Sequence, residues 1–300
     1  MSSDSDSDSD YDDAPATETS NQARFTIDKT HPQIITLVGN PRSGKSTLLK
    51  SILYRYAYQE KFFKSGLIFC PSDDGDLEEW IDEKYVITTY TEEALLGYID
   101  KLRKKQHEKR KELEKAGRKK KYILPPNFLV LDDLSQGMIN WYSPGIANWL
   151  SRFRKTNTWV FITCQYLNQG SSTALREYTS IFAFFAQKTT NALNGAYRAT
   201  GGAMFENKKE FFKVLRKTTD KEYTALVFVE ANPPDKRVFS FKCELPPEGW
   251  KITFGKDERG RQQQAKQEHG NSSAQNATSQ NNILNVIDSA VRRYESRARQ

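Results

Sequence analysis

The sequence predicts an α/β protein whose sheet is mostly parallel and carries an antiparallel hairpin at one edge. Short apolar runs recur along the chain, and segments long enough for crossover helices separate several of them. A late pair of such runs is joined by Asn-Pro-Pro-Asp, which is typical of a hairpin. The predicted strands are residues 34–38, 67–70, 85–88, 128–131, 159–163, 181–185, 224–230 and 237–242.

Local signals support these elements in order. The run Ile34–Val38 is apolar and β-branched and ends at a glycine, so it predicts a buried strand, and residues 46–58 are expected to form the helix that follows. The second strand stops at Pro71 and an acidic turn. Thr91 is expected to cap a long helix, because two glutamates fill its first turn and Lys and Arg follow.

The composition indicates one large folded domain and excludes several classes of protein. With 37% hydrophobic residues, 17 Phe, 14 Tyr and 5 Trp, the 300-residue chain can bury a substantial core. Three widely spaced cysteines exclude a disulfide framework, and no apolar run approaches the roughly 18 residues of a membrane span. The predicted organisation is a disordered acidic tail (1–24), one domain (25–256), a polar linker (257–282) and a basic amphipathic helix (283–300).

The net charge of +7 is distributed asymmetrically. Residues 1–23 carry six Asp, one Glu and no basic residue, so they contribute −7 and the rest of the chain +14. Their Ser-Asp alternation is expected to be disordered, and it is either a solubilising tail or a substrate of acid-directed eukaryotic Ser/Thr kinases. The positive remainder favours a polyanionic partner, because clustered Lys and Arg bind phosphate backbones.

A phosphate-binding loop follows the first predicted strand. The segment Gly39-Asn-Pro-Arg-Ser-Gly-Lys45-Ser46 fits G-x-x-x-x-G-K-[ST] at every fixed position. Its glycines let backbone N–H groups turn toward phosphate oxygens at a helix N-terminus. Lys45 is expected to reach the β- and γ-phosphates of ATP, and Ser46 to ligate Mg²⁺. The predicted nucleotide-binding residues are Gly39, Asn40, Pro41, Arg42, Ser43, Gly44, Lys45, Ser46 and Thr47.

Two carboxylates follow the predicted strand 128–131. Asp132 supplies the hard oxygen that Mg²⁺ needs there, and Asp133 is expected to polarise the attacking water. A nucleotide kinase needs no such pair, so the two motifs together predict an ATPase.

Three polar residues lie near the next strand, 159–163. Gln165 follows it, where the amide can hydrogen-bond both the γ-phosphate and water. Arg154 precedes the strand and Arg176 comes after it, and either one could stabilise transition-state charge across a subunit boundary in a ring. An ordinary surface position is the alternative for both arginines.

The order of these motifs resembles that of the genome-packaging ATPases of poxviruses and other large DNA viruses, and of their polinton-like and virophage relatives in the FtsK–HerA superfamily. The resemblance covers roughly residues 32–242. Its matching features, in chain order, are Gly39…Gly44-Lys45-Ser46, Asp132-Asp133, Arg154-Lys155-x-Asn157, Thr163-Cys-Gln165, Leu175-Arg176 and an aromatic strand. Family members commonly have His after the first arginine, where this chain has Lys155.

The resemblance implies a RecA-like P-loop core that forms a ring and pulls DNA into a preformed capsid by hydrolysing ATP with Mg²⁺. It implies that Lys45, Ser46, Asp132, Asp133 and Gln165 form the ATPase site. Arg154 and Arg176 are the candidate trans-acting fingers, with Arg154 preferred. The partners implied are DNA, single- or double-stranded, further copies of the chain and a capsid protein.

Two basic segments have several interpretations. Residues 101–121 contain twelve Lys or Arg and three Glu, on a helix expected to end near Gly117. This stretch is a DNA phosphate-tracking surface, a nuclear import signal at Arg118–Lys121, or a solvated helix face. The predicted helix 283–300 could bind nucleic acid, an anionic membrane surface or a partner such as a capsid component.

Two other functions are consistent with the same motifs. A DNA helicase or cell-type translocase would use the same site, and a nucleotide-gated scaffold would switch partner contacts with little turnover. Asp133 and Gln165 argue against the scaffold, since a pure binder needs neither. The acidic N-terminal segment is the opposite of a secretory signal. We therefore expect an intracellular protein, and the Ser-Asp tail favours a eukaryotic host. The resemblance implies an infected cell, with the protein in the nucleus, in a cytoplasmic virus factory or in the virion.

Overall fold

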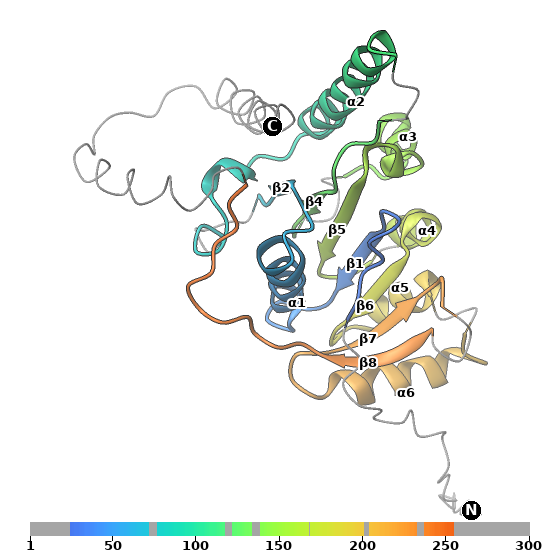
Figure 1. Ribbon diagram of the computed structural model, residues 1–300. Helices are drawn as coiled ribbons and strands as arrows, with labels where there is room; N and C mark the ends of the chain where they lie inside the picture. The colour runs from blue at the N-terminus through green and yellow to red at the C-terminus, as the bar shows by residue number, and fades with distance from the viewer. Residues whose placement is uncertain are drawn as a thin grey trace, which may run out of the picture.

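A computed structural model describes residues 25–71, 77–117, 122–133, 139–167, 169–200, 204–232 and 237–254. Its centre is an eight-stranded sheet in the order β3-β2-β4-β5-β1-β6-β7-β8 (Figure 1). The strands are β1 (Ile34–Val38), β2 (Ser65–Phe69), β3 (Val86–Ile87), β4 (Asn127–Leu131), β5 (Thr158–Cys164), β6 (Ile181–Phe184), β7 (Thr224–Val229) and β8 (Val238–Lys242). The strands from β3 to β6 pair in parallel, and β6-β7-β8 pair antiparallel, which confirms the predicted fold class.

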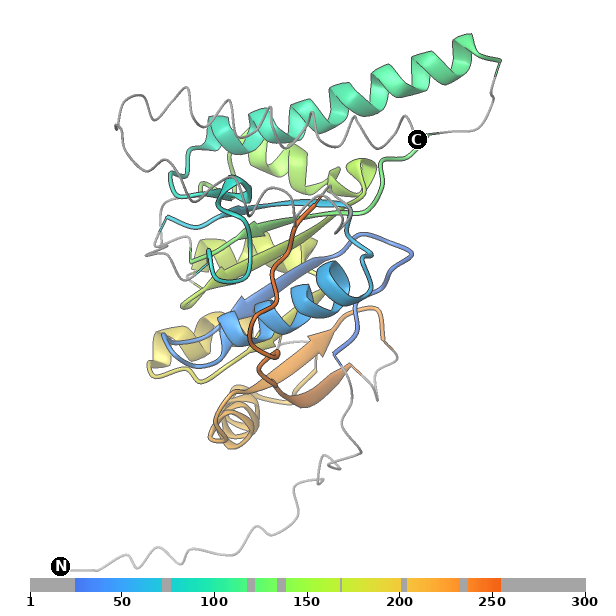
Figure 2. The same ribbon diagram turned by 60° about the vertical axis from the view of Figure 1, so that its left-hand side comes forward.

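Helices cover both faces of the sheet and make three layers. The α-helices are α1 (Lys45–Leu53), α2 (Glu92–Lys115), α3 (Pro144–Leu150), α4 (Gln169–Tyr178), α5 (Thr190–Ala199) and α6 (Lys208–Thr219). Two 3₁₀ turns, η2 (Glu83–Tyr85) and η3 (Phe153–Thr156), precede β3 and β5. Helix α1 lies on one face, whereas α2 to α6 lie on the other, with α2 and α6 at opposite ends of the sheet (Figure 2). None of these helices is long and apolar enough to cross a membrane.

The two faces of β1 anchor both halves of the core. Ile34 and Val38 pack into the layer with α2 to α6, while Ile35 and Leu37 pack against α1. All five residues of this strand are buried, as expected for a parallel strand covered on both sides. Burial of each large apolar side chain contributes roughly 1.5–3 kcal/mol, so the position of β1 in the middle of the sheet is strongly specified.

The remaining expectations about elements are largely confirmed. The Thr91 hydroxyl accepts the Ala94 N–H at 3.0 Å and begins α2, which ends before Gly117 at a φ of +71°. The third strand is shorter than expected, because Tyr85 belongs to η2. The first helix ends as a π-helix, η1 (Tyr54–Gln59), whose wider turn stacks Tyr54 on Tyr58. The acidic tail, the linker and the C-terminal helix lie outside the described residues.

Two glycines in the middle of helices provide a stability test. A methyl group at Gly195 in α5 would lie 2.0 Å from the Leu167 carbonyl oxygen, whereas one at Gly97 in α2 would meet nothing within 4 Å. We predict that Gly195→Ala lowers the free energy of unfolding by about 1–3 kcal/mol. Gly97→Ala should raise it by about 0.5–1 kcal/mol. Urea unfolding of both variants checks this, and equal effects would contradict the close approach of α5 to Leu167.

Candidate active site

The polar ends of three central strands meet at the carboxyl edge of the sheet. Strands β4, β5 and β1 are neighbours and run parallel, so the residues after Leu131, Cys164 and Val38 emerge at one edge. Ligands of parallel α/β sheets bind at this edge, outside the strand ends. The fold therefore brings the phosphate-binding loop, the two aspartates and Gln165 to one place, as the sequence predicted.

The loop between β1 and α1 is tied to the strands on both sides. The Gly39 N–H donates to the Cys164 carbonyl at 3.1 Å, and the Asn40 N–H donates to the Ala186 carbonyl at 3.1 Å. A methyl group at Gly39 would lie 2.5 Å from Phe185 Cβ. Gly44 has a φ of +113°, a conformation that strongly favours glycine. Both glycines of the motif are therefore required by the geometry of the loop.

Lys45 occupies the centre of this loop. Its ammonium group donates to the carbonyl oxygens of Gly39 at 2.8 Å and Asn40 at 3.0 Å, and its side chain is buried. Burial lowers the pKa of Lys45, while Asp133, Cys164 and Asp132 act in the opposite direction. The ammonium group thus lies inside the loop, where the anionic oxygens of a phosphate would replace its present carbonyl partners.

Other donors in the loop are oriented inward without a partner. Asn40 Nδ2 and Ser43 Oγ are buried and have no hydrogen-bond partner in the described part of the chain. Such orphaned groups are costly unless a ligand or water pairs with them. Ser46, by contrast, is exposed in the first turn of α1. The loop therefore offers unpaired polar groups that fit a polyphosphate.

Asp132 is held from two neighbouring strands. The Thr163 hydroxyl at the end of β5 donates to Asp132 Oδ1, and the Cys70 thiol after β2 donates to Asp132 Oδ2 at 3.4 Å. Burial raises the pKa of the Asp132 carboxyl, and the hydrogen bonds from Thr163 and Cys70 oppose that rise. The carboxylate is thus fixed in one orientation, which suits it as a hard ligand for Mg²⁺.

Asp133 follows in a left-handed conformation, with a φ of +42°. Its N–H donates to the Thr163 hydroxyl at 2.8 Å, and its Oδ1 accepts from Gln165 Nε2 at 3.5 Å. A positive φ in a non-glycine residue is strained and is found often at functional sites. Thr163 thus contacts both aspartates, donating to one side chain and accepting from the backbone of the other.

The two candidate arginines lie away from this edge. Arg154 precedes β5 and its Nε donates to the Pro32 carbonyl at 3.3 Å, next to the start of β1. Arg176 is exposed in the last turn of α4, which leads back to the start of β6. Both therefore lie toward the amino edge of the sheet, so neither can act on a nucleotide held by Lys45 of the same chain.

Sequence reasoning missed three residues at the carboxyl edge. Thr163 was assigned to a strand and to the Thr163-Cys-Gln165 match but given no role in the site, although it lies two positions before Gln165 and therefore on the same side of β5. Cys70 was not considered for the site at all. Gln187 follows Ala186, and both polar atoms of its amide are buried without a partner in the described chain; this makes it a candidate for contacting a bound ligand.

Comparisons with known proteins concern the fold alone. No protein-family profile and no curated protein matches the chain. It is similar to the conjugation coupling protein TcpA of pCW3, solved as a monomer with ATPγS, with a TM-score of 0.51 and 17% identity over 73% of this chain and 62% of that one. It is also similar to the cytoplasmic domain of the type VII secretion ATPase EccC of Thermomonospora curvata, with a TM-score of 0.50 and 15% identity over 72% and 26% of the two chains.

The chain is also similar to the genome-packaging NTPase B204 of Sulfolobus turreted icosahedral virus 2, solved in complex with AMPPCP. The match covers 73% of this chain and 100% of that one, with a TM-score of 0.46 and 16% identity. At these identities each likeness is one of architecture. The likenesses to TcpA and EccC support the predicted α/β fold and extend no further than the fold.

Proposed function

We propose that this protein is an ATPase that hydrolyses ATP between the subunits of a ring and uses the energy to move DNA into a preformed viral capsid. The observation that carries the proposal is the convergence of Lys45, Asp132, Asp133 and Gln165 at one sheet edge. Thr163 bonds both aspartates there, and Gln165 bonds Asp133. A protein that only binds nucleotide needs the loop and Lys45 but has no use for the second aspartate and the glutamine.

In this proposal the ATP triphosphate lies in the loop of residues 39–46. The backbone N–H groups at the start of α1 and the unpaired Ser43 hydroxyl contact its oxygens, and the Lys45 ammonium leaves its two carbonyl partners to contact the β- and γ-phosphates. Ser46 and Asp132 would hold Mg²⁺, which supplies positive charge against the phosphate oxygens when it is bound.

The Asp133 carboxylate would orient and polarise the attacking water. Its left-handed backbone and its bond to Thr163 aim it beyond the end of β4, and the amide of Gln165 lies beside it. Gln165 would then contact the γ-phosphate and the water together and so respond to hydrolysis. Since Arg154 and Arg176 face away from the site of their own chain, either would act on the neighbouring subunit.

The alternatives use part of the same machinery. A helicase or cell-type translocase would share the site and differ in what it does to DNA. A nucleotide-gated scaffold would bind ATP with little turnover. DNA, further copies of the chain and a capsid protein are the partners of the proposed motor, in an infected cell or in the virion.

The first prediction concerns Asp133. We expect Asp133→Asn to reduce ATP turnover at least 100-fold while leaving ATP binding within a few-fold of wild type, because the base is lost and the loop is intact. Turnover with and without duplex DNA and equilibrium binding of a fluorescent ATP analogue measure the two effects. Asp220→Asn, an exposed position after α6 with the same change of charge, is the control. Wild-type turnover in Asp133→Asn would contradict the assignment.

The second prediction concerns Thr163 as a positioning residue. We expect Thr163→Val, which keeps the shape and removes both hydrogen bonds, to lower kcat about tenfold or more with little change in KM. Thr36→Val is the matched control, because Thr36 is also buried in a central strand and bonds only the Thr179 hydroxyl, at 2.9 Å. Equal losses of kcat in the two variants would indicate a merely structural role for Thr163.

A further inference from the structure

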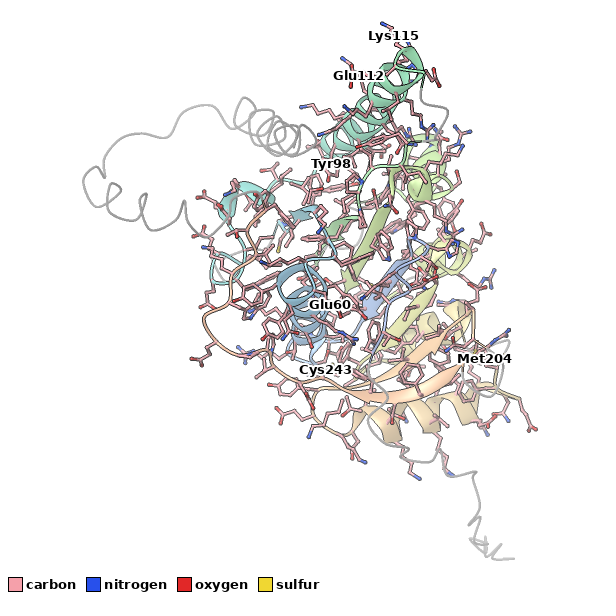
Figure 3. All side chains as sticks on the ribbon, viewed as in Figure 1. Glu60, Tyr98, Glu112, Lys115, Met204 and Cys243 are labelled. Carbon is pink, nitrogen blue, oxygen red and sulfur yellow. The ribbon has the colours of Figure 1, made fainter. Side chains whose placement is uncertain are left out.

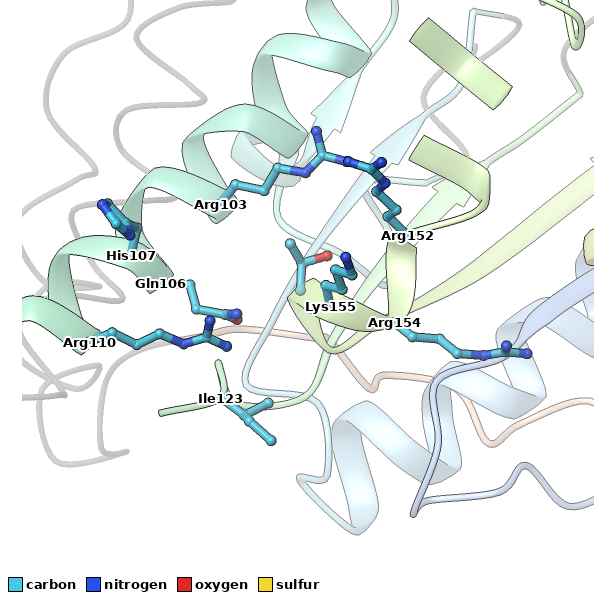
Figure 4. A pocket seen from close by; sticks show the side chains of 9 residues that line it. Arg103, Gln106, His107, Arg110, Ile123, Arg152, Arg154 and Lys155 are labelled. Atoms are coloured by element: carbon cyan, nitrogen blue, oxygen red, sulfur yellow. The ribbon is translucent and has the colours of Figure 1, made fainter. Parts of the chain in front are cut away.

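A positively charged cleft lies at the amino edge of the sheet, between α2 and the turn that leads into β5. Its volume is about 640 Å³ (Figure 4). The lining residues come from α2, from the approach to β4 and from η3, and they are Arg103, Gln106, His107, Arg110, Ile123, Arg152, Arg154, Lys155 and Thr156. Among the residues that the structure describes, four arginines and one lysine line it and no carboxylate does. It is separate from the loop that holds Lys45, which lies at the opposite edge.

The cations in this cleft are poorly neutralised by the chain itself. Only Arg103 has an ion-pair partner among the described residues, Asp100 at 3.3 Å, whereas Arg110, Arg152 and Lys155 have none. The guanidinium groups of Arg103 and Arg152 point toward one another (Figure 4). Arg103 Nη2 is also buried and has no hydrogen-bond partner in the described part of the chain. Like charges held close together repel, so this arrangement favours a bound anion.

The wall of the cleft on α2 is a single stripe of the helix. Arg103, Gln106, His107 and Arg110 recur at spacings of three and four, which places them on one face. Gln106 Oε1 accepts the Leu124 N–H at 3.4 Å, and Arg110 Nε donates to the Tyr122 carbonyl at 3.0 Å. These two hydrogen bonds hold this face of α2 against residues 122–124, which lead into β4.

The opposite wall is equally well supported. The Thr156 carbonyl and the Asn157 carbonyl both accept from Asn127 Nδ2 at 2.9 Å, and Asn157 Nδ2 donates to the Leu124 carbonyl at 2.8 Å. Phe153 and Thr156 are buried, which leaves Arg152 and Lys155 exposed on the outside of the turn. The cations are therefore presented by a rigid scaffold.

We propose that this cleft binds the phosphodiester backbone of DNA. The proposal rests on the proposed function, which requires DNA as a partner, and it assigns the DNA site to these residues. Arginine forks match phosphate oxygens in geometry and charge. The described lining residues include no Phe, Tyr or Trp on which successive bases could stack, so we expect contacts to the backbone and binding that is independent of sequence. Because ATP binds at the other edge, DNA and ATP can be bound at the same time.

The length of α2 extends the same surface. Its 24 residues span about 36 Å, and its far end, with Glu112 and Lys115, projects beyond the sheet (Figure 3). Lys104, Lys111 and Lys115 are exposed along it. A surface of this length fits a long rod of regularly spaced phosphates. The acidic segment 1–23 of this chain is the other polyanion that could occupy the cleft.

The test measures the DNA affinity of the full chain. Fluorescence anisotropy with a labelled 30-base-pair duplex of mixed sequence, at 50 to 200 mM salt, compares wild type with Arg103→Ala/Arg152→Ala. We expect affinity to fall about tenfold or more and the slope of log affinity against log salt to lose about two units, because two phosphate contacts are removed. Equilibrium binding of a fluorescent ATP analogue without DNA should be unchanged, since neither residue is near the Lys45 loop of its own chain.

Two further variants keep the test decisive. Arg152→Ala/Lys155→Ala changes two exposed side chains, so it reports on the cleft if the first variant folds poorly. Lys209→Ala/Lys213→Ala removes two exposed cations from α6, at the other end of the sheet, and should leave affinity unchanged.

The outcomes separate this inference from the proposed function. Wild-type affinity and salt slope in both cleft variants would overturn the inference and leave the acidic segment as the remaining occupant, while DNA-stimulated turnover would keep the proposed function intact. An equal loss in the α6 variant would also overturn it, because the effect would then be one of net charge. Absence of DNA binding by wild type would overturn both proposals.

Discussion

The pairing of β1 with β5 determines where the loop that holds Lys45 lies relative to the polar end of β5. Their register runs from Ile34 opposite Val160 to Val38 opposite Cys164, and the Gly39 N–H then extends the ladder with one more bond to the Cys164 carbonyl. The phosphate-binding loop therefore begins next to the polar end of β5. A slip of one residue in β5 would turn Thr163 to the other face of the sheet and separate both aspartates from their common partner.

Local sequence was sufficient to predict the strands, the glycine-containing loop after β1 and the cap of α2, because each depends on residues that are close in the chain. Apolar runs that end in Gly or Asp specify strands, and the fixed positions of the loop are required by backbone geometry. The π-helix after α1 was not predictable, since Tyr54 and Tyr58 pack against Trp250, far along the chain. The role of Thr163 depends on three strands becoming neighbours, which no local pattern shows.

The two edges of the sheet have opposite chemistry. The carboxyl edge gathers Lys45, the two aspartates and the unpaired donors of the loop. The amino edge gathers arginines of which only Arg103 has a carboxylate partner among the described residues. Strand β5 connects them directly, with Thr163 at one end and η3 at the other. In the proposed function, a change at the Thr163 end of this strand would have a short, rigid route to the cleft, and coupling of ATP hydrolysis to movement on DNA would use such a route.

Displacement of a third strand from duplex DNA distinguishes a DNA motor from a nucleotide-gated scaffold. A fluorescent oligonucleotide bound as a triplex is removed when a motor moves along the duplex beneath it. Our account predicts displacement by the wild-type chain with ATP, none with a non-hydrolysable analogue, and none by Asp133→Asn. Turnover of ATP that is indifferent to DNA and displaces no third strand would contradict a motor and favour a nucleotide-gated scaffold.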